Sequence, residues 1–266
     1  MTFKWLESQF IIEQLVKGGR KHRTDRRRIN KKALIVGIGL AFIMIGGAVV
    51  AVLMNSPSTA LNKNDNSEVI QRIVAPISEN VPVLASEGGS SNVTMVEFGD
   101  YQCQYCARFH NETKDQIVNN FVNTGNLRFA FKDFVINDLP SDRASTLAAE
   151  ASYCAADQGK YWQYHDELYD NSRGENTGWV TEDSLKQFAS KIGIQNLTEF
   201  SGCIENHTHR DLVEANTQLA QGIGLRSTPS FVIISNETVP IAIEGAQPYT
   251  VFKQAIDDVL ANVSRA

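Results

Sequence analysis

Two cysteines three residues apart, Cys103 and Cys106, constrain the fold of this chain most strongly because of what flanks them. Residues 93–98 are mostly apolar or β-branched, and they predict a short buried strand. Apolar residues then recur at helical spacing through 109–122, which predicts a helix. The cysteine pair therefore lies where a strand ends and a helix begins.

This position has a chemical consequence for the two thiols. The first turn of a helix has unpaired backbone N–H groups and a partial positive charge, which stabilise a thiolate. We therefore expect Cys103 to be the more exposed thiol with the lower pKa, and Cys106 to lie one turn further in. The arrangement favours thiol–disulfide exchange, with Cys103 as the attacking thiol and Cys106 as the resolving thiol.

Two other interpretations of the cysteine pair are a plain structural disulfide and half of a zinc site. Zinc needs further Cys or His ligands at suitable spacing. The sequence contains no second pair of cysteines with this spacing and no His-x-x-x-His motif. Redox chemistry is therefore the favoured interpretation.

The segment 96–106, Val-Glu-Phe-Gly-Asp-Tyr-Gln-Cys-Gln-Tyr-Cys, resembles the active-site segment of the DsbA-like thiol:disulfide oxidoreductases of the thioredoxin superfamily. Glu97 lies six residues before Cys103, where this superfamily places a buried acid. Residues 227–231 resemble its cis-proline loop, and 153–162 resemble the opening of its inserted helical region. The resemblance covers about residues 81–262.

The resemblance implies roles for three residues beside the cysteines. A cis bond between Thr228 and Pro229 would place this loop beside Cys103, where it pairs with an extended substrate strand and keeps metal away. Thr228 would contact the cysteine pair and tune it. Glu97 would move the proton of Cys106 as a general acid–base, the alternative being a charged residue at a strand end. One departure is the Gln-Tyr dipeptide between the cysteines, where many members carry Pro-Phe or Pro-His.

The fold predicted from the pattern and the resemblance is α/β, thioredoxin-like, with a mixed central sheet. A second strand at 127–132 is expected to pair in parallel with 93–98 through a right-handed crossover. A helical insertion is expected at about 141–222. A hairpin and an amphipathic helix should complete the fold, at 231–234, 239–243 and 251–260.

The residues before this domain predict a membrane anchor. Residues 33–54 contain no charged residue, and a helix of that length rises about 33 Å, enough to cross a bilayer. Up to residue 54, 10 Lys/Arg stand against 3 Asp/Glu, a charge of +7; the remainder has 15 against 27, a charge of −12. The positive-inside rule then predicts a basic cytoplasmic segment at 1–32, a linker at 55–80 and an external domain at 81–266. Nucleic-acid binding by the basic run is the less favoured interpretation.

The other two cysteines, Cys154 and Cys203, both lie in the predicted insertion. Free thiols outside the cell tend to pair, so we expect a disulfide here; two unpaired buried cysteines are the alternative. Some members of the resembled family carry a structural disulfide in this insertion. His110 is interpreted as a surface residue of the first helix, the alternative being a positive charge near the thiols. His207 and His209 are interpreted as part of a solvated polar face, the alternative being a metal site.

These observations together predict a membrane-anchored, single-pass, extracytoplasmic enzyme that exchanges disulfides with exported proteins, foremost as an oxidase. A redox partner in the same membrane would reset the cysteine pair, and no cofactor, metal or nucleic acid is expected. A thiol reductase or disulfide isomerase would use the same residues at another redox potential. A non-enzymatic alternative is a copper-delivery module that uses Cys103 and Cys106 as soft ligands.

Overall fold

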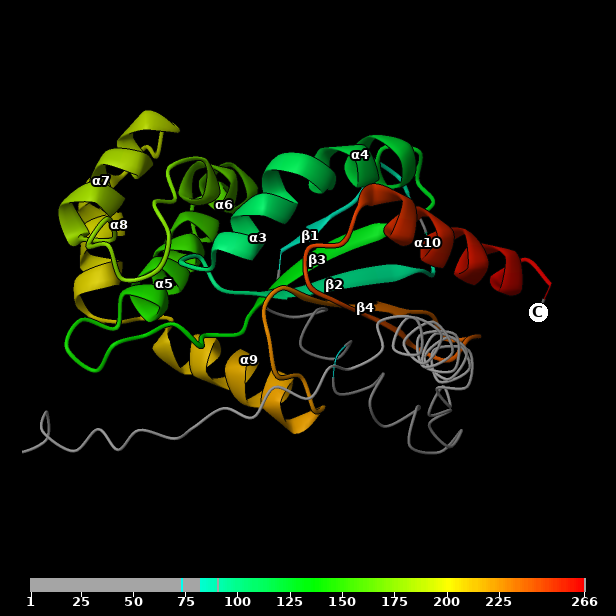
Figure 1. Cartoon of the computed structure of the whole chain (residues 1–266). Helices are drawn as coiled ribbons and strands as arrows, with labels where there is room; N and C mark the ends of the chain where they lie inside the picture. The colour runs from blue at the N-terminus through cyan, green and yellow to red at the C-terminus, as the bar shows by residue number, and fades with distance from the viewer. Residues whose placement is uncertain (1–72, 74–81, 90, 266) are drawn as a thin grey trace, which may run out of the picture. The chain divides into compact units, whose positions relative to one another are not determined.

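A computed structural model describes residues 73, 82–89 and 91–265, which belong to the compact unit Leu61–Ala266. In this part of the chain, five strands form one mixed sheet in the order β1-β3-β2-β4-β5 (Figure 1). Their bounds are β1 Val83–Leu84, β2 Thr94–Gly99, β3 Arg128–Asp133, β4 Ser230–Ile234 and β5 Ile241–Glu244.

The strand pairing follows the predicted scheme. β2 runs parallel to β3 and antiparallel to β4, and β4 and β5 form an antiparallel hairpin. Four of the strands were predicted within a residue or two of their bounds. β1 was not, because two residues are too few to show alternation, and this strand exists through its pairing with β3.

The first helical segment is not one regular α-helix. It consists of α3 Gln104–Phe109, the π-helical turn η1 His110–Lys114, α4 Asp115–Ile117 and a second π-helical turn, η2 Val118–Val122. Each π-helical turn adds one residue to its turn and so changes which side chains face inward. The Lys114 side chain is buried as a result, and that of His110 is only 9% exposed.

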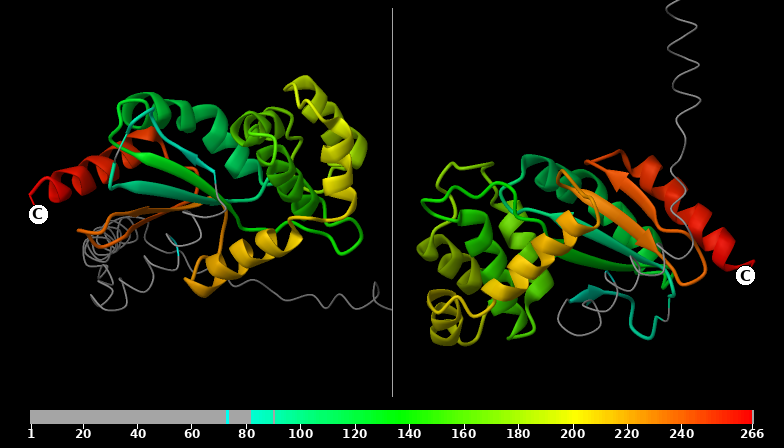
Figure 2. Two further views of the ribbon diagram at one scale, coloured as in Figure 1. Left: turned by 180° about the vertical axis from the view of Figure 1, so that it is seen from behind. Right: turned by 90° about the horizontal axis from the view of Figure 1, so that it is seen from below.

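Helices cover both faces of the sheet (Figures 1 and 2). The first helical segment and α10 Tyr249–Val263 pack on one face, against side chains such as Phe129 and Phe231. α9 Arg210–Gly222 packs on the opposite face, against Val96, Phe98 and their neighbours. Because side chains alternate along a strand, Glu97 lies on the same side as the first helical segment.

The region between β3 and β4 is helical as predicted, and its helices gather at one end of the sheet (Figure 2). Before α9 they are α5 Ala144–Ala156, α6 Tyr161–Asp170, α7 Glu182–Lys191 and α8 Leu197–Glu205. Cys154 in α5 and Cys203 in α8 form a disulfide with their Cα atoms 5.9 Å apart, which confirms the expected pairing.

The predicted segments 1–32 and 33–54 lie outside the described residues, as does all of 55–80 except Ile73. Ile73 is helical and buried, and it belongs to the cluster of apolar side chains on the α9 face of the sheet. Among the described residues, the helices are too short or too polar to cross a bilayer.

Candidate active site

The turn between β2 and α3 is held by the carboxylate of Asp100. Its Oδ1 accepts a hydrogen bond from the backbone N–H of Gln102 at 2.9 Å. Its Oδ2 accepts from the N–H groups of Ile136 and Asn137 at 2.9 and 3.0 Å. The backbone N–H of Cys103 then donates to the Asp100 carbonyl at 3.0 Å. Four backbone N–H groups therefore donate to Asp100, three to its carboxylate and one to its carbonyl, and they fix the loop that carries Cys103.

Gln102 ties this turn to the helical insertion. Its Nε2 donates to Ser145 Oγ at 2.8 Å, and its Oε1 accepts from the backbone N–H of Asn176 at 3.0 Å. The side chain is buried, so both of its polar ends need these partners. The insertion is thus part of the support of the cysteine pair.

Cys103 is the N-terminal cap residue of α3, and its thiol faces the loop before β4. Its Sγ donates to the carbonyl oxygen of Thr228 at 3.4 Å. The Thr228–Pro229 peptide bond is cis, as the resemblance implied. The backbone N–H of Gly245 donates to the Pro229 carbonyl at 2.8 Å, which fixes the loop against the end of β5.

The two thiols have opposite pKa shifts. A hydrogen bond from the Cys106 thiol, supported by Thr228 and by backbone N–H groups at the start of α3, lowers the pKa of Cys103 to about 6. Burial raises the pKa of Cys106 well above its usual value, and the neighbouring Cys103 raises it further. Neither thiol is substantially exposed, at 3% for Cys103 and 0% for Cys106. Cys103 therefore ionises near neutral pH, whereas Cys106 stays protonated.

Glu97 lies in the middle of β2, with 1% of its surface exposed and its Oε1 without a hydrogen-bond partner in the described part of the chain. Burial raises the pKa of this carboxyl well above its usual value; the charge of Lys114 lowers it and that of Cys103 adds to the rise. The buried position therefore favours the protonated carboxyl over the carboxylate. The Glu97 charge also contributes to the raised pKa of Cys106, which places the two groups close together.

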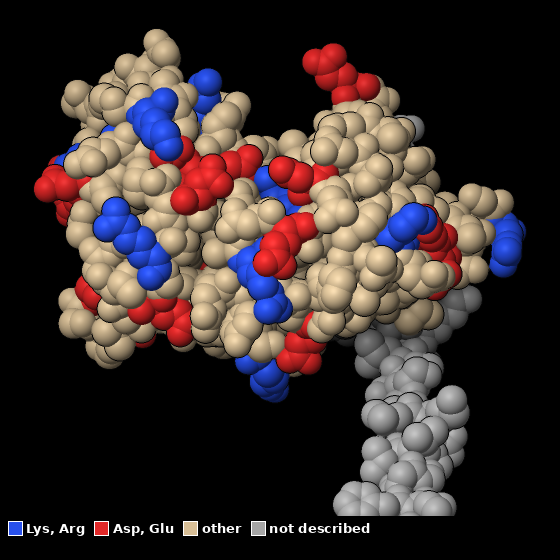
Figure 3. Space-filling view, turned by 45° about the horizontal axis from the view of Figure 1, so that its top comes forward, with Lys and Arg blue, Asp and Glu red and all other residues tan. Residues whose placement is uncertain are grey.

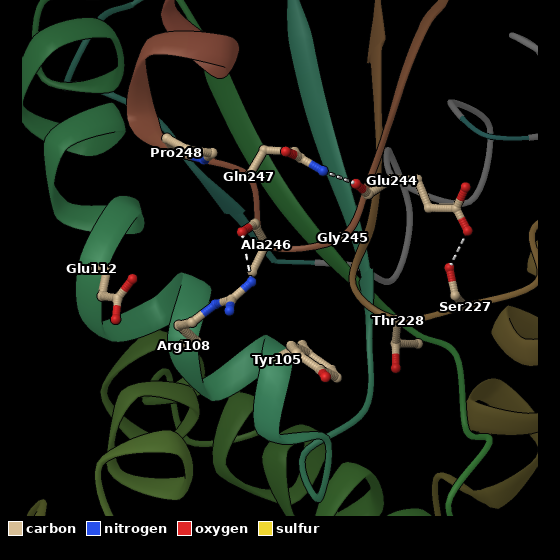
Figure 4. A pocket seen from close by; sticks show the side chains of 10 residues that line it. All are labelled: Tyr105, Arg108, Glu112, Ser227, Thr228, Glu244, Gly245, Ala246, Gln247 and Pro248. Atoms are coloured by element: carbon tan, nitrogen blue, oxygen red, sulfur yellow. Dashed lines mark hydrogen bonds between the residues drawn. The ribbon is translucent and has the colours of Figure 1, made fainter. Parts of the chain in front are cut away.

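A groove of about 630 Å³ lies between α3 and the loops that precede β4 and follow β5 (Figure 4). Arg108 of α3 crosses it and donates to the Ala246 carbonyl at 2.9 Å, and its guanidinium lies 5.2 Å from the centre of the Tyr105 ring. Tyr105 is 49% exposed. Thr228 also lines the groove, so the groove extends to the cysteine pair.

The structure brings together all five residues to which the sequence assigned roles, Cys103, Cys106, Glu97, Thr228 and Pro229. Sequence reasoning missed Lys114. This lysine lies in a polar stretch of the sequence, and nothing in that stretch indicated that its side chain would be buried near Glu97. Among the described residues, the clusters of three or more His, Cys, Asp and Glu ligand atoms contain neither Cys103 nor Cys106. In this part of the chain, no His, Asp or Glu ligand atom therefore completes a three-ligand site with the pair.

The interpretation of His110 as a surface residue is wrong. Its side chain lies against α6, stacked on Tyr169 with ring centres 5.3 Å apart and with Nε2 3.2 Å from Asp170 Oδ1. The interpretation failed because a helical pattern of period 3.6 places residue 110 on the outer face, and the π-helical turn η1 rotates it inward.

Comparison with known proteins places the chain in a family. Residues 89–258 match the family described as Thioredoxin, which is well over half of the chain. Disulfide bond formation protein D of Bacillus subtilis is 28% identical over 188 residues, which is 70% of this chain and 79% of that protein. The structure of oxidised BdbD from Bacillus subtilis has a TM-score of 0.62 at 24% identity, covering 70% of this chain and 95% of that one.

A second solved structure, alpha-DsbA1 of Wolbachia pipientis, has a TM-score of 0.58 at 20% identity and covers 69% of this chain and 92% of that one. At these identities the two solved structures establish the fold, and the residues around the cysteine pair carry the chemistry. The chain therefore belongs to the thioredoxin family and is a DsbA-like thiol:disulfide oxidoreductase.

Proposed function

We propose that this enzyme is an oxidase that transfers its Cys103–Cys106 disulfide to exported proteins. The observation that carries the proposal is the opposite direction of the two pKa shifts, lowered to about 6 at Cys103 and raised at Cys106. A thiol with a lowered pKa is a good leaving group in disulfide exchange, and its stability as a thiolate favours the reduced form of the enzyme.

In the first step, a substrate thiolate attacks Cys103 Sγ of the enzyme disulfide. The Cys103–Cys106 bond breaks, a mixed disulfide forms between substrate and Cys103, and the bonding electron pair goes to Cys106. A Cys106 thiolate is unfavourable in its buried position, so it needs a proton. We assign the supply of this proton to the carboxyl of Glu97, because its charge influences the pKa of Cys106.

In the second step, another thiolate of the substrate attacks the substrate sulfur of the mixed disulfide. The electron pair of the broken bond now goes to Cys103, which leaves as a stabilised thiolate. The substrate has lost two electrons and gained a disulfide, and the enzyme is reduced. A second redox protein must take these electrons from the enzyme before the next cycle.

The groove beside Cys103 supplies room for an extended substrate segment. The loop at Thr228 and Pro229 packs against Cys103, and the exposed Tyr105 ring offers an apolar surface. Lys and Arg side chains are interspersed with Asp and Glu on the face shown in Figure 3, without a large region of one sign.

The reduction potential of the cysteine pair in the full chain, measured by equilibration with glutathione, tests the direction of the reaction. The pKa of about 6 lies between the values of about 3.5 for DsbA and about 7 for thioredoxin. We expect a potential between those of DsbA, about −120 mV, and thioredoxin, about −270 mV. A potential near the value of about −270 mV for thioredoxin would indicate a reductase instead.

We propose further that residues 33–54 anchor the enzyme in a membrane with the N-terminus cytoplasmic. Support comes from the uncharged stretch and from the basic run that precedes it. Protease added to intact cells should remove the catalytic domain and spare a tag at Met1. Protection of both ends would contradict the external placement.

A further inference from the structure

His110, His165 and Asp166 form a cluster outside the cysteine pair. His110 belongs to η1 of the first helical segment, and the other two belong to α6 of the insertion. One ring nitrogen of each histidine and one carboxylate oxygen of Asp166 all lie within 4.8 Å of one another. Nothing in the exchange reaction described above uses these three side chains.

The two histidines each have one ring nitrogen with a partner and one without. His110 Nε2 lies 3.2 Å from Asp170 Oδ1, and His165 Nδ1 lies 3.1 Å from the hydroxyl of Tyr101. The other nitrogens, His110 Nδ1 and His165 Nε2, are buried without a hydrogen-bond partner in the described part of the chain. A buried polar atom without a partner costs free energy, so two in one cluster require an explanation.

This pattern is typical of histidines that bind metal. A metal-bound imidazole commonly donates its other N–H to a carboxylate or another oxygen, which fixes the tautomer and the ring orientation. Asp170 accepts from His110 Nε2–H, which leaves the lone pair of Nδ1 free. The Tyr101 oxygen can accept from His165 Nδ1–H in the same way, which leaves the lone pair of Nε2 free.

The cluster also has a rigid wall and an open side. The His165 side chain is fully buried, and the ring of Phe131 lies 4.8 Å from it, centre to centre. The centres of the two imidazole rings are 6.1 Å apart. The side chain of Asp166 is 43% exposed, so an ion can reach the cluster from solvent past this carboxylate.

We propose that His110 Nδ1, His165 Nε2 and an Asp166 oxygen bind one divalent transition-metal ion, with zinc as the reference ion. Two imidazole nitrogens and one carboxylate oxygen suit zinc and the neighbouring transition metals, whereas calcium and magnesium need mostly oxygen ligands. Zinc–ligand bonds of about 2.0–2.2 Å separate tetrahedral ligand atoms by about 3.4 Å. His110 Nδ1 and Asp166 Oδ1 are 3.9 Å apart, so this pair must approach by about 0.5 Å, and no pair of ligand atoms within the 4.8 Å limit must approach by more than about 1.4 Å.

Lys114 competes with the metal ion for Asp166. Its Nζ donates to Asp166 Oδ1 at 2.6 Å. Metal binding must displace this ammonium group from at least one carboxylate oxygen. An ion at the cluster would then connect η1, four residues beyond Cys106, to α6 of the insertion, and it would hold the insertion against the helix of the cysteine pair.

Zinc titration of the oxidised full chain tests the proposal, because in oxidised protein all four cysteines of the chain are in disulfides. We expect one equivalent of Zn²⁺ to bind and to raise the melting temperature, since the ion binds the folded state. His110→Gln and Asp166→Asn should each weaken binding by about 100-fold or more. His209→Gln, which changes a histidine beside Asp157 and the insertion disulfide, is the matched control and should bind like wild type.

Co²⁺ in place of Zn²⁺ gives a second readout that does not depend on stability. Its visible absorption should show nitrogen and oxygen ligands without a thiolate charge-transfer band, and His110→Gln should abolish the spectrum. Lys114→Gln should bind Zn²⁺ more tightly than wild type, because it removes the competing cation. Wild-type protein that binds no Zn²⁺, or binds it equally well after His110→Gln, would overturn the proposal. None of these outcomes depends on the redox direction of the cysteine pair.

Discussion

Cys103 and Cys106 lie three residues apart at the start of a helix, whereas Cys154 and Cys203 join two helices across 49 residues. The position along the helix is the main difference. Cys103 caps the N-terminus of α3, but Cys154 and Cys203 lie in the last turn of α5 and of α8. A helix N-terminus stabilises a thiolate and a helix C-terminus destabilises it.

The groups next to the two cysteine pairs show the same contrast: they favour a thiolate at Cys103 and oppose one at Cys203. Cys103 has the Cys106 thiol and the start of α3 to stabilise its negative charge. Cys203 lies 3.8 Å from the carboxylate of Asp157, whose charge would oppose a thiolate. Local charge therefore makes one cysteine pair reactive and leaves the other structural. Substitutions in the two pairs test this contrast.

The largest effect is expected from single substitutions in the reactive pair. Cys103→Ser should reduce exchange to the uncatalysed rate, because the sulfur that substrates meet is gone. Cys106→Ser should instead accumulate mixed disulfides with reduced substrate proteins, since the resolving thiol is absent. Non-reducing electrophoresis with mass spectrometry distinguishes the two. If Cys103→Ser traps substrates and Cys106→Ser does not, the assigned roles are reversed.

Glu97→Gln should slow exchange by about 100-fold, because the amide keeps the size of the side chain but cannot transfer the proton of Cys106. The free energy of unfolding, by contrast, should rise at pH 7. A carboxyl whose pKa is raised in the folded state stabilises the fold at low pH and loses that contribution as pH rises, so the neutral amide should be more stable at pH 7.

Stopped-flow exchange kinetics and urea unfolding measure the two effects of Glu97→Gln separately. Glu237→Gln, an exposed position in the turn between β4 and β5, is the control and should change neither. An unaltered exchange rate in Glu97→Gln would remove the carboxyl from the mechanism.

Replacing both insertion cysteines by serine should lower the free energy of unfolding by about 2–4 kcal/mol, because the unfolded chain gains the freedom of a 49-residue loop. The exchange rate at Cys103 should stay close to that of wild type, in contrast to the first prediction. Denaturant unfolding and an exchange assay on the same sample measure this. Loss of exchange in a variant that remains folded would show that the second pair is not merely structural.

The smallest effect concerns the pKa of Cys103 itself. In reduced protein, its alkylation rate should rise with pH through a midpoint of about 6. Because this pKa is depressed on folding, the thiolate stabilises the reduced protein at pH values above about 8.5 and that contribution is lost as pH falls through about 6. The midpoint should be higher in Cys106→Ala than in Cys106→Ser, since only serine retains a donor to the thiolate. Equal midpoints would assign the lowered pKa to Thr228 and the helix start instead of Cys106.

Much of the fold was predictable because it follows from local patterns. Apolar alternation predicted β3, two apolar segments joined by a turn predicted the β4–β5 hairpin, and helical periodicity predicted α10. The two π-helical turns were not predictable, because they arise from packing of the first helical segment and leave no periodic signal.

The cysteine pair was recognisable from its spacing and from the strand–helix junction, and the loop at Thr228 from the resemblance. The cause of the Cys103 pKa shift was only partly predicted. The sequence pointed to the helix start, whereas the thiol of Cys106 has the larger effect. The cluster of His110 with His165 could not be predicted, because it joins residues 55 positions apart through a bulged helix.

The distance along the chain between Cys103 and its partner loop has a consequence for biosynthesis. Thr228 lies 125 residues after Cys103, so ribosomes working at about 5–20 residues per second need about 6–25 s to make the intervening chain. During that interval the Cys103 thiol of the nascent chain is not yet in contact with the loop before β4. The Cys154–Cys203 disulfide joins two cysteines that follow one another along the chain. Cys103 and Cys106, both free thiols in this structure, also follow one another, so emergence in chain order favours the correct connectivity.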